Sequence, residues 1–157
     1  MKKTTKSFYN VKNNGHIKFS VKDIDSGSRT VCAVLNTYNY LDFDGDVLMP
    51  KCCDKSIKDR GVDSTSPDKI LHALFHDLTR LPGKIKTLDE RNIDGIDCLY
   101  MESKLTDTID GTDTLKNYLA GIYNQHSIGF QYTKTEFVER EAHGNSKKWD
   151  SLVKGLI

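Results

Sequence analysis

KIKTLDERNIDGIDCLYMESKL, residues 84–105, has the pattern of a β-hairpin. Alternate positions in its second half are occupied by Ile96, Cys98 and Tyr100, and alternation is the side-chain period of a strand. Asp94-Gly95 supplies turn residues between the two halves. We therefore expect one strand over residues 84–88 and a second over residues 95–105.

Four further strands are predicted around this hairpin. Residues 16–24 alternate between apolar and polar side chains, and residues 30–35 are almost wholly apolar and β-branched, which is typical of a half-buried and a more deeply buried strand. Ser26-Gly27-Ser28 is the expected turn between them. The apolar run 70–76 fits a strand or a helix, but its shortness and the flanking prolines favour a strand. Residues 127–133 alternate again and predict the last strand.

Helical periodicity is clearest in a stretch that Thr112 or Asp113 caps. The apolar residues there recur at the i, i+3, i+4 and i+7 positions of one helix face, and they are Leu115, Tyr118, Leu119 and Ile122. A short helix is predicted over residues 51–59, where Gly61 ends it, and another over residues 149–156.

The composition is that of one globular domain, and it excludes several classes of partner. The chain has 157 residues, of which 37% are hydrophobic and 29% charged, and its formal net charge is +1. The nearly balanced charge gives no overall positive electrostatic field that would attract nucleic acid. No apolar stretch is long enough to span a bilayer.

The N-terminal segment is basic, but the apolar region of an export signal does not follow it. We therefore expect a cytosolic protein, whose four cysteines are thiols because no Cys-x-x-Cys spacing or oxidising compartment is indicated.

Two patterns imitate metal sites. His72 and His76 are four residues apart, as in zinc-binding helices, but Ala73 stands where that motif needs Glu. On a strand the two rings would be about 13 Å apart, so we expect no zinc. Asp42, Asp44 and Asp46 resemble the start of a calcium loop, but the required Gly and closing Glu are absent, and a solvated turn is the better interpretation.

Two short motifs could perform acyl transfer. Phe75-His76-Asp77 offers a proton acceptor and Ser127-Ile128-Gly129-Phe130 offers a hydroxyl. If both segments are strands, alternation turns Asp77 away from the His76 ring and His126 away from Ser127. Gly129 leaves the face beside Ser127 open to a peptide. From spacing alone an ordinary exposed serine and a structural histidine remain open alternatives.

A family resemblance rests on five motifs in order, which span residues 36–130. They are Asp44-Gly45-Asp46-Val47 followed by Pro50, then Phe75-His76-Asp77, Pro82-Gly83-Lys84, Asp107-Thr108 with Gly111 and Asp113, and Ser127-Ile128-Gly129-Phe130. This series resembles the tailed-phage prohead protease family, the capsid-maturation serine proteases related to the herpesvirus assemblins. The resemblance implies that His76 is the general base and Ser127 the nucleophile.

The fold that the resemblance implies is an α+β domain, mainly β, built as a small antiparallel β-barrel with packed helices. Members of the family place a third catalytic residue, often acidic, on a strand after the serine, in a motif like Glu-x-Ser that this chain lacks. The acids nearest after the serine are Glu136, Glu139 and Glu141. We therefore expect residues 1–157 to form a single protease-like domain without its C-terminal strand.

The implied function is cleavage of a phage capsid or scaffold precursor, and of the protease itself, inside the prohead in the host cytoplasm. The resemblance also implies a homo-oligomer and requires no cofactor. The alternative is a catalytically inactive capsid assembly or scaffolding module with the same fold. An esterase-like hydrolase ranks last, because the chain lacks the Gly-x-Ser-x-Gly elbow.

Overall fold

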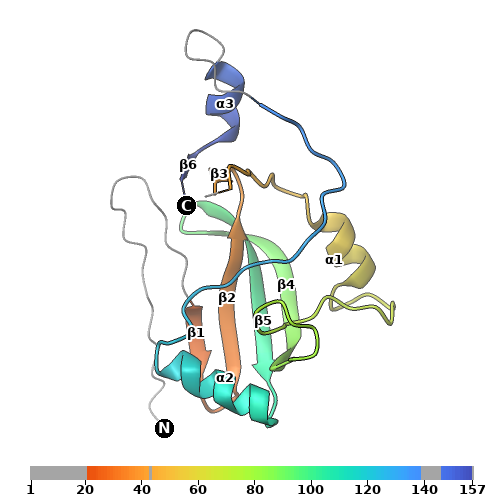
Figure 1. Cartoon of the computed structure of the whole chain (residues 1–157), viewed down its shortest axis with the longest axis vertical. Coiled ribbons are helices and arrows are strands. Elements are labelled where there is room, and N and C mark those ends of the chain that lie inside the picture. Colours follow the sequence, from red (N-terminus) through yellow and green to blue (C-terminus); the bar gives the residue numbers. More distant parts are fainter. Residues whose placement is uncertain (1–20, 43, 139–145, 157) are drawn as a thin grey trace.

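An open antiparallel sheet forms the centre of the molecule (Figure 1). The computed structural model describes residues 21–42, 44–138 and 146–156. Four strands pair in the order β1-β2-β5-β4, and they are β1 (Val21–Asp25), β2 (Thr30–Thr37), β4 (Gly83–Ile93) and β5 (Ile96–Leu105). A separate parallel pair joins β3 (Tyr40–Leu41) to β6 (Gly155–Leu156).

The predicted hairpin is confirmed as β4 and β5, and it is longer than expected. Pairing continues to Ile93 opposite Ile96, so β4 extends five residues past the predicted end at Leu88. Asp94 (φ 54°) and Gly95 (φ 85°) form the turn, and positive φ at both central residues suits the twist of a two-residue hairpin. The hairpin therefore supplies the two longest strands of the sheet.

The first two strands are also confirmed where the structure describes them. β2 covers the predicted residues 30–35 and runs on to Thr37. β1 begins at Val21, and the first five residues of the predicted strand 16–24 lie outside the described residues. In the turn between β1 and β2, the Asp25 carboxylate accepts the N–H of Gly27 at 2.8 Å, which is the expected chemistry of a turn aspartate.

One face of the sheet carries the core. Strand alternation puts Val31 and Ala33 of β2 on the same face as Leu99, Met101 and Leu105 of β5.

Two helices contribute to the clusters on this face. Near one end of the sheet, Val31 and Leu105 pack against Leu115 and Tyr118 of α2 (Ile109–Leu119). Near the other end, Ala33, Leu99 and Met101 pack with Ile85 and Leu88, and Ile57 of α1 (Asp54–Arg60) contacts this cluster. Figure 1 shows α2 across the lower end of the sheet and α1 beside β4.

The predicted closure into a barrel is not confirmed, because the described strands form an open sheet, whereas the α+β class and the antiparallel pairing are confirmed. The four strands pair in a line, so within the described residues β1 and β4 are the two edges of the sheet. A barrel requires the first strand to pair with the last, and four strands are too few to enclose a core of side chains. The helices and loops on one face bury the apolar residues instead.

The helix predicted from the apolar spacing of residues 115–122 is confirmed as α2, but it begins about one turn earlier than predicted. α2 begins at Ile109, and the side chain of Thr108 caps it by accepting the N–H of Gly111 at 3.3 Å. The helix ends at Leu119. The first two of the four predicted apolar positions are buried, whereas Leu119 is 44% and Ile122 66% exposed. α1 ends at Arg60 with Gly61 as its C-cap, as predicted, but it begins at Asp54 and not at Lys51. α3 (Ser146–Leu152) stops earlier than predicted because Gly155–Leu156 pairs with β3.

Two predicted strands are wrong, and both contain candidate site residues. Residues 70–76 make only isolated bridges, between His72 and Gly83 and between Leu74 and Asp77. Residues 127–133 have no regular secondary structure. Alternation of apolar and polar residues indicates that a segment has one buried and one exposed side. A strand must also form backbone hydrogen bonds with the free edge of a sheet. Both segments instead lie in the layer that covers the sheet, where Ile70 and Ile128 pack on the core.

None of the helices formed by the described residues has both the length and the apolarity required to cross a membrane.

Candidate active site

His76 lies in a tight, exposed turn. The N–H of Asp77 donates to the carbonyl of Leu74 at 2.9 Å, and the two central residues, Phe75 (φ 53°) and His76 (φ 59°), are both left-handed. Positive φ at both positions is typical of a type I′ turn, but for residues with a Cβ it costs roughly 1–3 kcal/mol each. The turn therefore holds the imidazole out into solvent in a conformation that the surrounding structure must maintain.

Asp77 is not the orienting partner of His76. Its Oδ1 accepts the backbone N–H of Thr79 at 2.9 Å and the Thr79 hydroxyl at 2.6 Å. These two hydrogen bonds stabilise the carboxylate and lower the pKa of Asp77. The predicted strand alternation between His76 and Asp77 is absent, and within the described residues no hydrogen bond joins the Asp77 carboxylate to the His76 ring.

Ser127 is exposed and is held by its neighbours. The side chain of His126 before it and that of Ile128 after it both point into the covering layer, where Ile128 packs on the core cluster that contains Leu88 and Met101. Ser127 itself and Gly129 are exposed. Although the predicted strand is absent, this segment presents the hydroxyl to solvent as a nucleophile requires.

The structure brings the two candidate motifs together. The ring of His76 lies against Gly129, two residues after Ser127, and a Cβ built on Gly129 would be 3.2 Å from His76 Nδ1. Within the described residues, no hydrogen bond joins the His76 ring to Ser127 Oγ. Hydrogen bonds between catalytic groups are often long in the unliganded state and shorten when substrate binds. The contact therefore places the candidate base His76 and the candidate nucleophile Ser127 on adjacent segments.

His126 cannot serve as the base for Ser127. Its Nε2 is hydrogen-bonded to Tyr118 Oη at 2.7 Å, and the two rings stack with centroids 5.6 Å apart. Its Nδ1 is buried without a partner in the part of the chain that is described. Burial, and to a lesser extent His72, lowers the pKa of His126 to about 4. At neutral pH the ring is therefore uncharged, and its Nε2 is occupied by the hydrogen bond with Tyr118.

A second serine and histidine pair was missed by the sequence interpretation. His72 Nδ1 is hydrogen-bonded to Ser103 Oγ at 2.9 Å, which is the spacing of a catalytic dyad. Ser103 is 0% exposed and His72 is 9% exposed, so a peptide bond cannot reach the hydroxyl. Burial lowers the pKa of His72 to about 4. This pair is a buried polar contact that joins the covering layer to β5.

The metal-like patterns take structural roles. His72 is buried and His76 is exposed, so the two rings do not share a site. Asp42 Oδ1 accepts the N–H groups of Asp44 at 3.0 Å and Asp46 at 2.8 Å, as in the solvated turn that the sequence predicts. Asp46 also accepts a hydrogen bond from the Tyr132 hydroxyl, which ties this turn to the segment that follows Ser127.

The chain was also compared with known protein families, curated proteins and solved structures. A family described as caudovirus prohead serine protease matches residues 17–152 of the chain. The chain belongs to that family. No curated protein shows a significant match. No solved structure does so either.

Of the three acids closest after Ser127 in sequence, only Glu136 lies in the part of the chain that the structure describes, and it is not placed as a third catalytic residue. Glu136 is exposed and forms an ion pair with Lys148, which lowers the pKa of Glu136. Glu139 and Glu141 lie outside the described residues. A carboxylate that is paired with a lysine in solvent is not available to orient His76.

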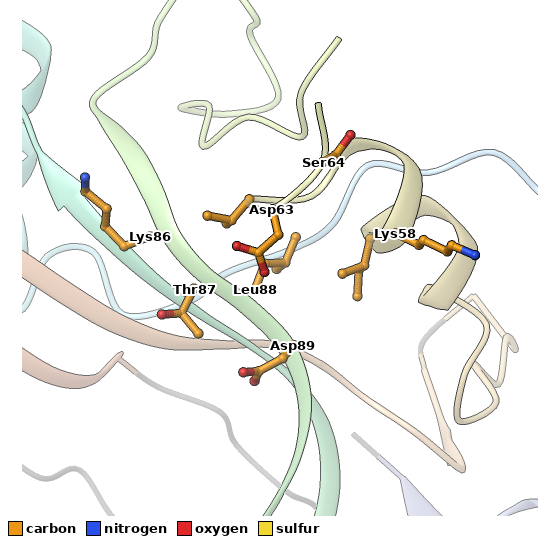
Figure 2. Close-up of a pocket in the computed structure, with 9 residues that line it drawn as sticks. Lys58, Asp63, Ser64, Lys86, Thr87, Leu88 and Asp89 are labelled. Carbon is orange, nitrogen blue, oxygen red and sulfur yellow. The ribbon is translucent and has the colours of Figure 1, made fainter. Parts of the chain in front are cut away.

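A pocket separate from the two motifs lies beside the edge strand β4 (Figure 2). Its volume is about 540 Å³, and its lining residues are Ile57, Lys58, Val62, Asp63, Ser64, Lys86, Thr87, Leu88 and Asp89. In Figure 2, Asp63 reaches toward β4 from the loop after α1. Ile57 and Leu88 also belong to the core cluster that Ile128 contacts. The prohead protease chain therefore has its pocket and its serine segment on the same covered face of the sheet.

Proposed function

We propose that this chain is a prohead maturation endopeptidase in which His76 is the general base and Ser127 the nucleophile. One observation carries the proposal: the His76 ring contacts Gly129, on the exposed segment that presents Ser127. A turn before β4 and a segment after α2 are distant in the sequence, and their contact supports the proposal because a serine protease, as the matched family is described, needs a histidine close to its serine.

The reaction follows from these two groups. His76 removes the proton from Ser127 Oγ as that oxygen forms a bond to the carbonyl carbon of the scissile peptide. The tetrahedral intermediate then expels the amine, to which His76 returns the proton, and the acyl group remains on Ser127. Water, activated by His76, attacks the ester carbonyl and releases the new carboxylate together with the free serine.

The exposure of both motifs suits a protein substrate. Ser127, Gly129 and His76 are all exposed, and Gly129 has no side chain to obstruct an extended peptide. The substrates we propose are the scaffold or capsid precursor and the protease itself. Cleavage would take place inside the prohead in the host cytoplasm, with the protease as a homo-oligomer.

Ser127 reactivity provides the first test. An activated fluorophosphonate probe is expected to label the wild-type chain at Ser127, and peptide mapping identifies the site. Ser127→Ala should abolish the labelling, and His76→Ala should slow it by about 10²–10⁴-fold because the general base is lost. Ser103→Ala is the matched control, since Ser103 is 0% exposed and should not react.

Co-expression with the capsid precursor separates the protease from the alternative assembly module. The proposed enzyme predicts that precursor processing is lost in both Ser127→Ala and His76→Ala. Labelling of Ser127 that is unchanged in His76→Ala would remove His76 from the mechanism. An unlabelled wild-type chain that leaves the precursor intact and still supports shell assembly would favour the inactive module.

A further inference from the structure

Each candidate catalytic residue directly follows an aromatic residue. Phe75 precedes His76, and His126 precedes Ser127. Neither catalytic residue is in a helix or a strand, so regular backbone hydrogen bonds do not fix their separation. The preceding rings are connected to each other through Tyr118 and Tyr123, and we name the four residues Phe75, Tyr123, Tyr118 and His126 the aromatic bridge.

The contacts of the aromatic bridge are continuous from one motif to the other. Phe75 and Tyr123 meet edge to face, with centroids 6.0 Å apart and an interplanar angle of 90°. Tyr123 and Tyr118 meet in the same way at 5.7 Å and 84°. Tyr118 and His126 are stacked at 5.6 Å and 12°, and a 2.7 Å hydrogen bond joins Tyr118 Oη to His126 Nε2. All three separations lie in the favourable range for aromatic pairs.

The end of α2 anchors the middle of the bridge. Gly121 (φ 76°) follows the C-cap, its N–H donates to the carbonyl of Tyr118, and the N–H of Ile122 donates to the carbonyl of Asn117. These two bonds form a Schellman motif, which reverses the chain at the helix end. The reversal brings Tyr123 beside Tyr118, and Tyr118 is only 5% exposed. Tyr123 is therefore fixed to the helix from which the serine segment continues.

Phe75 shows why the bridge matters for His76. Two consecutive left-handed residues with side chains persist only when their surroundings maintain them. Phe75 is 74% exposed, so burial in a core does not hold the turn. The edge-to-face contact with Tyr123 is the aromatic contact that the structure gives Phe75, and it joins the turn to α2.

We infer that Tyr123 is a positioning residue, which holds the Phe75-His76 turn at the correct distance from Ser127. This inference rests on the proposed function, because it assigns Tyr123 a role in the reaction of those two residues. Tyr123 acts through its ring, since its hydroxyl has no hydrogen-bond partner within the described part of the chain. Displacement of a catalytic group by about 1 Å can lower a rate on the order of 10²-fold.

The test measures fluorophosphonate labelling of Ser127 at several probe concentrations, which separates the maximal labelling rate from the probe affinity. Tyr123→Leu is expected to lower the maximal rate by about 10–100-fold and to leave the affinity nearly unchanged. Tyr123→Phe keeps both ring contacts and is expected to restore the wild-type rate. Ile122→Ala is the matched control, because Ile122 is the adjacent residue and is 66% exposed.

Each outcome separates the inference from the proposed function. If the wild-type chain is not labelled, the proposed function fails. If it is labelled in a His76-dependent manner and Tyr123→Leu reacts at the wild-type rate, the function stands and the inference is overturned. Equal losses in Tyr123→Leu and Tyr123→Phe would also overturn it. Should Tyr123→Leu not fold, Phe75→Leu breaks the same contact at a residue that is 74% exposed, and its labelling rate decides the question.

Discussion

The imidazole of His76 occupies the space that a side chain on Gly129 would need. A Cβ at position 129 would lie 3.2 Å from Nδ1 and 3.7 Å from Cε1 of that ring. The 3.2 Å separation is tighter than an ordinary contact of a Cβ atom, whereas 3.7 Å is ordinary van der Waals contact. Gly129 therefore sets how closely the serine segment approaches the histidine turn.

Gly129→Ala is expected to impair the proposed protease without unfolding the protein. The new methyl group must push the exposed His76 ring away by a few tenths of an ångström, and since a displacement of about 1 Å costs on the order of 10²-fold, we expect a loss of roughly 2–10-fold in rate. Because His76 and Gly129 are both exposed, the change in the free energy of unfolding should stay below about 1 kcal/mol. Fluorophosphonate labelling and urea denaturation of the same preparation measure the two effects.

Gly27→Ala is the matched control for that experiment. A Cβ at Gly27 would also meet a polar side chain, Asp25 Oδ1 at 3.3 Å, but in the turn between β1 and β2. Its labelling rate should equal that of the wild type. If Gly129→Ala also reacted at the wild-type rate, the contact with His76 would have no importance for the reaction.

The sequence was most informative where one local signal determines the structure. Asp94-Gly95 can adopt the left-handed turn that a two-residue hairpin needs, so β4 and β5 were predictable. The N-cap residue of α2 could not be predicted, because Thr108, Thr112 and Asp113 all have side chains that can cap a helix. Thr112 accepts a hydrogen bond from Arg29 at 3.1 Å, a contact that no helix signal in the sequence encodes.

The geometry of the candidate site could not be predicted from the sequence. His76 and Ser127 are candidates that the motifs nominate, and strand alternation gave the wrong backbone for both segments. The contact of His76 with Gly129 and the aromatic bridge depend on how α2 and the histidine turn pack over the sheet. Tertiary packing of this kind leaves no periodic signal in the sequence. The buried pair of His72 and Ser103 was missed for the same reason.

Gly111→Ala is expected to destabilise the fold through the start of α2. A Cβ at Gly111 would lie 2.3 Å from the carbonyl oxygen of Thr106 and 2.6 Å from that of Pro82. Backbone atoms cannot move aside as a flexible side chain can, so α2 must shift away from β4 and β5. Overpacking of this kind costs roughly 1–3 kcal/mol. Urea denaturation should show a lower midpoint, and an unchanged midpoint would contradict this packing.

Ser103→Ala is expected to lower the free energy of unfolding by about 1–3 kcal/mol. The substitution removes the hydrogen-bond partner of His72 Nδ1 and leaves a buried polar atom unsatisfied. In a His72→Leu background the same substitution should cost much less, because no imidazole then lacks a partner. A double-mutant cycle by urea denaturation measures this coupling, and purely additive effects would show that the hydrogen bond is not formed.

Stability is expected to fall as the pH is lowered from about 6.5 toward 4. Burial lowers the pKa of His72 and of His126 from 6.5 to about 4 in the folded protein. The unfolded chain therefore binds more protons across this interval, so the stabilisation is fully present above pH 6.5 and is lost as the pH falls through 4. The slope approaches about 1.4 kcal/mol per pH unit for each histidine. Urea denaturation between pH 7.5 and 5 measures it, and His126→Gln should remove about half of the slope. A slope that the variant does not change would show that His126 is not buried in the neutral form.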